Sequence, residues 1–350
     1  MNGSLYLEWQ GVKTVNELDI AGLVSKLDTE DMLGHLRNFP RDFAHQMEIS
    51  QDGGSTPKTT LCLGMGGSAA AGDFLASLTD SYGSVQVKTW RNYGLPNWIG
   101  DGDLLISTSY SGNTEETLDS TAKGVEIGLE SVVISSGGKL SDFDNHVQVP
   151  SGQPPRSAFG HLFGALLRVA ISRGIVPAQE TDTLTKRLDE TVKEFDFVNN
   201  PESPTISIAK TLLEREVGIV SAPELDCAGI RFVNQLNENG GIFGRSNPLP
   251  EMNHNEIIAW TDKEASENQA LIFLTWSGMN ERVSKRVDWM MDSVEVEVAW
   301  QLHCEGESLL EAMLYSCIAM DWISCAIAIL RGKDPSAIGA IQDLKSYLSQ

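Results

Sequence analysis

The chain has 350 residues, 41% of them hydrophobic, and a formal net charge of −22 from 48 acidic and 26 basic side chains. This length and composition allow two globular domains, each with its own core. The acidity argues against nucleic acid and anionic membranes as partners, because like charges repel. An anionic small molecule would have to be bound by local groups, such as helix N-termini and single basic side chains.

The N-terminal sequence MNGSLYLEWQ lacks the basic and apolar segments of a secretory signal, so we expect a cytoplasmic protein. The longest apolar run, residues 317–330, contains Asp321 and is too short to span a bilayer. The odd number of cysteines and the absence of a CxxC pair predict reduced, buried thiols at positions 62, 227, 304, 317 and 325. The histidines lack metal-ligand spacing, so we expect no structural metal.

Helical periodicity between residues 15 and 50 includes Leu18 and Leu36, and we expect Pro40 to break the helix. We expect residues 1–50 to form a helical arm packed on a first sheet. Strand-like runs then alternate with helical stretches, at residues 59–65, 85–90, 103–108 and 131–135. This alternation predicts right-handed crossovers and a doubly wound parallel sheet within a first domain of residues 51–155.

Residues 146–156 are predicted to be an extended linker, followed by an amphipathic helix from about Ser157 to Ile175. Linking helices over residues 156–215 would lead to a second α/β domain of residues 216–350, including its C-terminal helices. Its strands are expected near residues 217–222, 270–276 and 293–300. The helix predicted at 308–331 is apolar on nearly all sides and must be buried between layers or at a subunit contact. The predicted class is therefore α/β, with two doubly wound parallel-sheet domains and flanking helices.

The stretch from Leu104 to Leu118, LLISTSYSGNTEETL, predicts a strand, a hydroxyl-rich loop and a first helical turn. Unpaired backbone N–H groups at the helix start would meet several side-chain hydroxyls there, an environment that suits a phosphate. Helix capping alone accounts for one hydroxyl at such a position. Three hydroxyls around a glycine, those of Ser109, Ser111 and Thr114, favour an anion site instead.

A second strand-to-helix junction, Leu61 to Ser68, has the sequence LCLGMGGS. Its glycines permit close approach of the backbone to a ligand, and Gly67 and Ser68 open the next helix. The glycine spacing does not satisfy the dinucleotide-binding fingerprint. Both junctions would lie outside the carboxyl ends of parallel strands, where such sheets bind ligands. A further polar turn at residues 135–139 either faces the same crevice or is an ordinary exposed turn.

The two junctions together resemble the sugar isomerase (SIS) domain, and SYSGNTEET and GMGGS resemble the bifunctional phosphoglucose/phosphomannose isomerase family. QPPRSAFGHLF is similar to the family's QPRxAxGYLF, apart from an inserted Pro155, which implies that Arg156 faces the substrate. NENG followed by PEMNHNEI is similar to the family's NENAK and PExNHNEI. This similarity implies that Glu238 and His254 are the catalytic glutamate and histidine.

The ending RGKDPSAIGAIQDLKSYL is similar to the family's RGxDPTPVxxIxxLKxxL, which implies that Lys345 lies at the active site. Two positions depart from the family. Gly241 or its neighbour Gly240 stands where the family has a lysine after its catalytic glutamate, and the C-terminal segment offers Ser336 and Ile338 in place of a substrate-contacting threonine. The resemblance covers residues 60–345 in islands.

The resemblance implies an aldose-ketose isomerase that interconverts fructose 6-phosphate with glucose 6-phosphate or mannose 6-phosphate, as in glycolysis or gluconeogenesis. The implied catalytic groups are Glu238 as the base, His254 as the ring-opening acid, Arg156 beside the enediolate, and Lys345. The phosphate would be bound by Gly67, Ser68, Ser109, Ser111 and Thr114. No metal or nucleotide cofactor is needed for this chemistry.

In relatives the histidine comes from the other subunit, which implies a homodimer with shared active sites. Two alternatives remain at this point. One is a non-catalytic phosphosugar-binding SIS regulator, which would need only the phosphate loop. The other is the isomerase half of a glucosamine-phosphate synthase, which is disfavoured because no glutaminase domain fits before residue 50.

Overall fold

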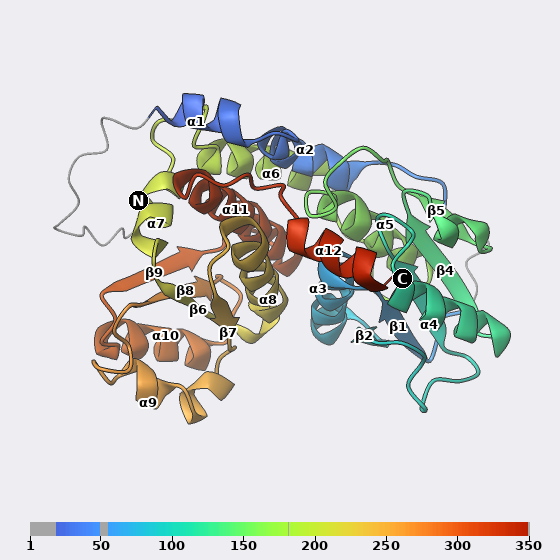
Figure 1. Cartoon of the computed structure of the whole chain (residues 1–350). Helices are drawn as coiled ribbons and strands as arrows, with labels where there is room; N and C mark the ends of the chain where they lie inside the picture. The colour runs from blue at the N-terminus through green and yellow to red at the C-terminus, as the bar shows by residue number, and fades with distance from the viewer. Residues whose placement is uncertain (1–18, 50–54, 181, 349–350) are drawn as a thin grey trace.

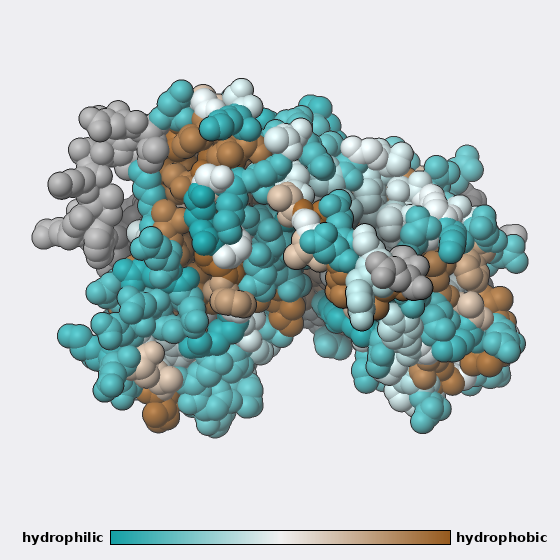
Figure 2. Space-filling model, in the orientation of Figure 1, coloured by the Kyte–Doolittle hydropathy of each residue, from teal (hydrophilic) through white to brown (hydrophobic). Residues whose placement is uncertain are grey.

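Two parallel β-sheets organise the molecule (Figure 1). The computed structural model describes residues 19–49, 55–180 and 182–348. Residues 1–18 of the predicted N-terminal arm, Leu18 included, lie outside the described residues. The surface in Figure 2 is mainly hydrophilic, and a hollow separates the parts of the molecule that carry the two sheets.

The first sheet has five strands in the order β2-β1-β3-β4-β5. Its strands are β1 (Thr59–Leu63), β2 (Gln86–Trp90), β3 (Leu104–Thr108), β4 (Glu130–Ser135) and β5 (His146–Gln148). The four predicted runs match β1 to β4, whereas β5 falls within the predicted linker. In the central pair, Leu63 of β1 lies opposite Ser107 of β3. The loops that follow these two strands therefore emerge side by side.

The second sheet has four strands in the order β7-β6-β8-β9. Its strands are β6 (Glu216–Ser221), β7 (Gly244–Ser246), β8 (Gln269–Thr275) and β9 (Val298–His303). All neighbouring strands in both sheets are parallel, and helices flank each sheet, which confirms the predicted fold class. The predicted strand at 293–300 starts too early, because α10 (Glu281–Ser293) occupies its first position.

The remaining helices connect and cover the sheets. Those of the first half are α1 (Ile20–Leu27), α2 (Met32–Ala44), α3 (Gly66–Tyr82), α4 (Glu115–Glu126) and α5 (Phe159–Ser172). Those of the second half are α6 (Asp182–Phe195), α7 (Thr205–Leu212), α8 (Asp226–Gln235), α9 (Ile257–Trp260), α11 (Leu309–Leu330) and α12 (Gly339–Leu348). Short helical turns are η1 (Lys139–Asp142), η2 (Pro223–Leu225), η3 (Leu236–Gly240) and η4 (Glu251–His254).

Helix α11 forms the centre of the molecule. Every residue from Leu309 to Ile329 is buried, and the helix packs against α2, α6, α7 and α8. By length and composition alone α11 could cross a membrane, but 94% of its most apolar stretch is buried inside the protein. The predicted burial of this helix is confirmed, and it acts as a core helix.

Asp321, a buried acidic residue in this apolar helix, is paired with a cation of α8. Arg231 Nη2 donates to Asp321 Oδ2 at 2.9 Å, and Gln235 Nε2 donates to Asp321 Oδ1 at 2.9 Å. Burial by itself would lower the pKa of Arg231, but the carboxylate of Asp321 outweighs burial and raises it. The ionised pair fixes α8 on α11, and with it the turn η3 that follows α8.

The predicted helix break at Pro40 is wrong, because α2 continues through this residue to Ala44. Phe39 packs on Phe159 of α5 with ring centroids 6.4 Å apart, and Phe43 packs on Phe163 at 6.0 Å. A proline inside a helix removes one backbone hydrogen bond. Aromatic packing on both sides of Pro40 holds the helix in place despite that loss.

The five cysteines are buried and form no disulfide, as predicted. Burial raises the pKa of the Cys62 thiol to about 12. The thiol is therefore neutral and serves as a small apolar packing group beneath the first sheet.

Candidate active site

The loop that follows β3, residues 109–114, is closed by a bond between two of its hydroxyls. Ser109 Oγ lies 2.9 Å from Thr114 Oγ1, and Ser109 N donates to Ile134 O at 3.0 Å. Thr114 stands at the N-cap of α4 but makes no side-chain capping bond. The Thr114 hydroxyl therefore does not cap α4, and no side chain caps the first backbone amides of this helix.

Glycine at position 112 lets this loop pack against the turn that follows β4. Gly112 has a φ of +65°, and a Cβ there would lie 1.7 Å from Gly137 O. Ser136 Oγ donates to Tyr110 O at 2.6 Å across the same contact. The predicted polar turn at 135–139 thus supports the serine loop. Ser111 stays exposed, and its Oγ accepts a hydrogen bond from the backbone of the same loop.

The glycine turn after β1 lies beside the serine loop. Gly66 has a φ of +53°, Gly67 is exposed, and Ser68 is half-buried in the first turn of α3. Ser68 Oγ accepts a hydrogen bond from Tyr110 N at 3.3 Å. The five residues predicted to bind phosphate therefore come from two neighbouring loops at the carboxyl ends of β1 and β3. Side-chain hydroxyls, together with backbone N–H groups that glycine leaves open to a ligand, suit a phosphate group at such a position.

Two residues predicted to be catalytic, Arg156 and Glu238, are in contact. Arg156 Nε lies 3.3 Å from Glu238 Oε2, while Arg156 Nη1 donates to Asn239 Oδ1 at 2.5 Å. Asn239 Nδ2 in turn donates to Ser324 Oγ of α11 at 2.9 Å. Arg156 is buried, whereas the side chain of Glu238 keeps 32% exposure. A rigidly held cation therefore lies beside a carboxylate that a ligand can reach.

The turn that carries Arg156 also contacts the serine loop. Gln153 N donates to Tyr110 Oη at 3.0 Å. Residues 153–156 thus join the two loops of the first sheet to Glu238 in the second half of the chain. Gln153 and Asn239 were not predicted to be site residues, although they lie within the motifs QPPRSAFGHLF and NENG.

Glu238 lies on a π-helical turn, η3 (Leu236–Gly240), which extends α8. Helices commonly end at a glycine in the left-handed conformation. The left-handed residue is Gly241, with a φ of +60°, and Arg331 Nη1 donates to Gly240 O at 2.7 Å. A π turn widens the helix locally and is common at functional sites. Here it projects Glu238 toward Arg156.

The C-terminal segment closes the other side of Arg156. Arg156 Nη2 donates to Ala337 O at 3.4 Å. Next to Ala337, the hydroxyl of Ser336 is buried and has no hydrogen-bond partner among the described residues. Lys345 lies on α12, whose side chains are exposed. Figure 1 shows α12 in the middle of the molecule, between the two sheets in this view.

His254 lies apart from the other predicted catalytic residues. Glu238 precedes β7 and His254 follows it, so the two lie toward opposite ends of the second sheet. His254 is exposed at the end of η4. Within the described chain, no hydrogen bond or ion pair joins His254 to Arg156 or Glu238. A single chain therefore brings together Arg156 and Glu238 but not His254.

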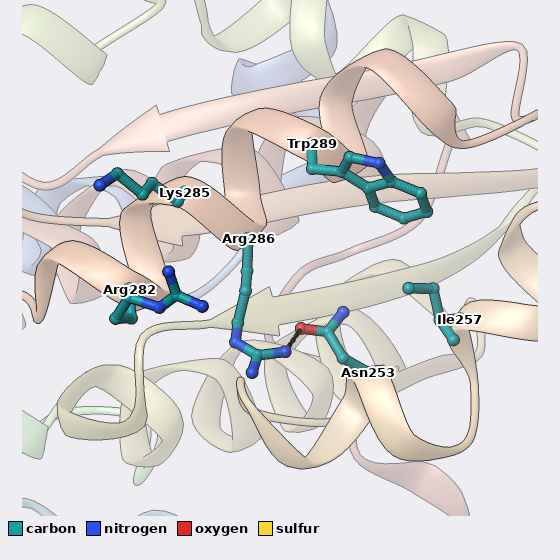
Figure 3. Close-up of a pocket in the computed structure, with 6 residues that line it drawn as sticks. All are labelled: Asn253, Ile257, Arg282, Lys285, Arg286 and Trp289. Atoms are coloured by element: carbon teal, nitrogen blue, oxygen red, sulfur yellow. Dashed lines mark hydrogen bonds between the residues drawn. The ribbon is translucent and has the colours of Figure 1, made fainter.

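A cavity of about 390 Å³ lies beside the turn that carries His254 (Figure 3). Its lining residues are Asn253, Ile257, Arg282, Lys285, Arg286 and Trp289. Arg286 Nη1 donates to Asn253 Oδ1 at 3.1 Å. The cavity contains none of the predicted site residues. Across the described ranges, no group of three His, Cys, Asp or Glu side chains is arranged to hold a metal ion.

Comparison with known proteins shows which family the chain resembles. Residues 202–348 match the family described as the bacterial phospho-glucose isomerase C-terminal SIS domain. The chain is 27% identical to the bifunctional phosphoglucose/phosphomannose isomerase of Thermoplasma acidophilum over 323 residues, which cover 90% of this chain and 100% of that protein.

A second relative, the bifunctional phosphoglucose/phosphomannose isomerase of Pyrobaculum aerophilum, is 30% identical over 81% of this chain and 85% of its own length. The solved C-terminal domain of glucosamine-fructose-6-phosphate aminotransferase from Francisella tularensis shares the fold, with a TM-score of 0.68 and 16% identity over 87% of this chain and 96% of that domain. By this similarity the chain is a phosphosugar isomerase, and it belongs to the bifunctional phosphoglucose/phosphomannose isomerase family.

Proposed function

We propose that the protein interconverts fructose 6-phosphate with glucose 6-phosphate, mannose 6-phosphate or both, by moving a proton between neighbouring carbons. The observation that carries the proposal is the turn of residues 153–156. This turn contacts the serine loop through Gln153 and Glu238 through Arg156. A phosphate anchor, a fixed cation and an accessible carboxylate are thereby joined in one site.

The chemistry follows from these three parts. Glu238 removes the proton from C2 of the open-chain aldose, and Arg156 stabilises the negative charge that develops on the enediolate oxygen. The hydroxyl proton then passes from O2 to O1, and Glu238 returns the carbon-bound proton to C1, which yields the ketose. A positioned base contributes about 10²- to 10⁴-fold to such a rate. Phosphate binding in the serine loop supplies the orientation, because it is remote from the reacting carbons.

We further propose that His254 opens the sugar ring in the active site of a second subunit, so that a homodimer shares two sites. The exposure of His254 and its separation from Glu238 support this role. Ile258, one turn further on, is 76% exposed, and such an apolar side chain gains from being covered by a partner. Lys345 is assigned to ring opening or to a sugar hydroxyl.

Ser336 is the residue that we expect to influence the choice between glucose and mannose phosphates. Its buried hydroxyl needs a hydrogen-bond partner, and the backbone of the next residue contacts Arg156. A sugar hydroxyl would satisfy it. Ser336→Ala should therefore change the ratio of glucose to mannose phosphate formed from fructose 6-phosphate, with little change in total turnover.

Proton NMR of fructose 6-phosphate in D2O tests the proposal directly. The wild type should produce aldose phosphate with deuterium at C2, and Glu238→Gln should lower the rate by about 10²- to 10⁴-fold. Glu264→Gln, at an exposed carboxylate of the second half, is the matched control and should behave as wild type. Shifts from binding without product or deuterium would instead identify a phosphosugar-binding regulator.

Mixing two inactive variants tests the shared site. In a heterodimer of Glu238→Gln and His254→Asn, one of the two sites would contain both native residues. Random exchange of subunits should then restore about a quarter of the wild-type activity. Failure to regain activity in a mixture shown by mass measurement to contain heterodimers would place His254 in its own subunit's site or outside catalysis.

A further inference from the structure

A buried polar network lies behind the serine loop, and the proposed chemistry does not use it. Its members are Asp42 of α2, Gln153, His161 of α5 and Tyr110 of the serine loop. Asp42 is 7% exposed and Tyr110 is 6% exposed. The network therefore connects a helix of the N-terminal region to the loop that carries Ser109.

The bonds of this network run in one chain from α2 to the loop. Gln153 Nε2 donates to Asp42 Oδ2 at 2.8 Å, and Gln153 N donates to Tyr110 Oη at 3.0 Å. His161 Nε2 lies 3.3 Å from Asp42 Oδ1. Gln153 thus links the two residues: its side chain bonds to the Asp42 carboxylate, and its backbone N–H bonds to the Tyr110 hydroxyl.

Tyr110 stands where three turns of the first sheet meet. Its backbone N–H donates to Ser68 Oγ of the glycine turn at 3.3 Å. Its carbonyl accepts from Ser136 N at 2.9 Å. Its hydroxyl accepts from Gln153. Because Tyr110 lies between Ser109 and Ser111, any movement of its ring is transmitted to both serines.

Asp42 and His161 are costly residues to bury, which argues that they do more than fill space. Burial raises the pKa of Asp42, against the opposing effects of Gln153 and His161. Burial also lowers the pKa of His161, whose Nδ1 has no hydrogen-bond partner within the described chain. The ring of His45 packs edge-on against His161 at 5.5 Å. Apolar residues would fill the same volume at lower cost.

We propose that Asp42 is a positioning residue for the phosphate group: it fixes Gln153, which holds the Tyr110 hydroxyl and thereby sets the geometry of Ser109 and Ser111. This inference rests on the proposed function of the serine loop as a phosphate site. Asp42 does not touch the substrate and acts only through Gln153.

A double-mutant cycle on the full chain tests the proposal, with inorganic phosphate as the probe and its Kd measured by calorimetry. Tyr110→Phe and Asp42→Ala should each raise this Kd about 3- to 10-fold, the range for loss of one hydrogen bond. The double variant should be no weaker than the weaker single variant, because both changes interrupt the same chain. Effects that multiply would overturn the proposal.

A conservative variant and a control on the same helix separate positioning from general destabilisation. Asp42→Asn retains an oxygen that accepts from Gln153 and should bind phosphate close to the wild-type affinity. Asn38→Ala removes an exposed side chain of α2, which donates only to Gly34 O at 3.2 Å, and should change nothing. With fructose 6-phosphate, Asp42→Ala should raise KM while kcat stays within about twofold.

The Ser109→Ala variant distinguishes a failure of the proposed phosphate site from a failure of the proposed positioning role of Asp42. Unchanged phosphate affinity in this variant would mean that the loop is not a phosphate site, and both proposals would fall. Weaker binding by Ser109→Ala, together with wild-type affinity in Tyr110→Phe and Asp42→Ala, would overturn the positioning role alone. If circular dichroism shows that Asp42→Ala does not fold, the Tyr110→Phe measurement decides.

Discussion

The two sheets have the same parallel architecture, but the helices that follow their central strands begin differently. In the first sheet, Thr114 stands at the N-cap of α4 and bonds to Ser109 instead of to the helix backbone. In the second sheet, Asn280 caps α10 by accepting from Arg282 N at 2.8 Å. A capped helix start has its amides satisfied, whereas an uncapped one can bind an anion.

The side chains that the two halves present also differ. The loops after β1 and β3 present small hydroxyls and glycines, whereas α10 presents Arg282, Arg286 and Trp289 to a cavity (Figure 3). The second half supplies Glu238 from the turn after α8, away from that cavity. Under the proposed function, one architecture has two uses: the first half would bind the phosphate, and the second half would contribute the base.

The largest expected effect comes from a methyl group in the serine loop. Gly112→Ala should lower the free energy of unfolding by about 2 to 5 kcal/mol, the sum of left-handed strain and overpacking against Gly137. Gly128→Ala is the matched control, since Gly128 also has a positive φ of +79° but has no atom within 4 Å of the added Cβ. It should cost about 1 to 2 kcal/mol. Urea unfolding measures both, and equal losses would refute the packing argument.

The contrast between the two helix starts predicts opposite results at Thr114 and Asn280. Asn280→Ala should lower the free energy of unfolding by about 1 kcal/mol and leave phosphate affinity unchanged. Thr114→Ala should cost little stability, because no cap is lost, but should raise the Kd of inorganic phosphate by about 3- to 10-fold. Calorimetry of phosphate binding and urea unfolding of both variants test these opposite effects on affinity and stability. Similar behaviour of the two variants would remove the basis of the comparison.

A smaller effect concerns pH and is confined to the first half. Burial holds the pKa of His161 below its ordinary value of 6.5, so the unfolded chain binds a proton more readily than the folded chain does. Stability is therefore present above 6.5 and is lost as the pH falls below that value. As the pH falls below 6.5, the Tm of the His161→Gln variant should decrease less than the Tm of the wild type. An identical pH dependence would mean that His161 does not titrate differently in the folded state.

The smallest expected effect lies in the second half. Arg286→Ala removes a cation from the cavity. It should change the Kd of inorganic phosphate by less than about twofold, because the cavity is lined by no residue of the serine loop and salt screens exposed charges. Phosphorus NMR with the Ser109→Ala chain as background would detect a second site. A clear loss of binding there would mean that both sheets bind anions.

Much of the fold could be predicted from the sequence, because buried parallel strands are apolar runs separated by helical stretches. The strands β5 and β7 were missed, since three residues are too few to show a pattern. The break expected at Pro40 was wrong because aromatic packing between α2 and α5 outweighs a local preference. The division of the chain into an N-terminal arm, two domains and linking helices stays a prediction.

The residues of the candidate site stay predictions from motifs, and the structure adds the contacts that connect some of them. Motifs identified Arg156 and Glu238, but only folding shows that α11, through Ser324 and Asn239, holds Arg156 beside Glu238. Gln153 could not be recognised because its role depends on Tyr110 and Asp42, which are distant in the sequence. The location of His254 at the far end of β7 is likewise a property of the topology.

The central position of α11 has a consequence for biosynthesis. The ribosome makes this helix after both sheets, yet α2, α6, α7 and α8 all pack against it. Until residues 309–330 emerge, the faces of those helices that contact α11 stay uncovered, and the nascent chain remains incompletely packed. Such chains aggregate readily and depend on chaperones. Release of the protein into a fully folded form should therefore follow the synthesis of α11 and not precede it.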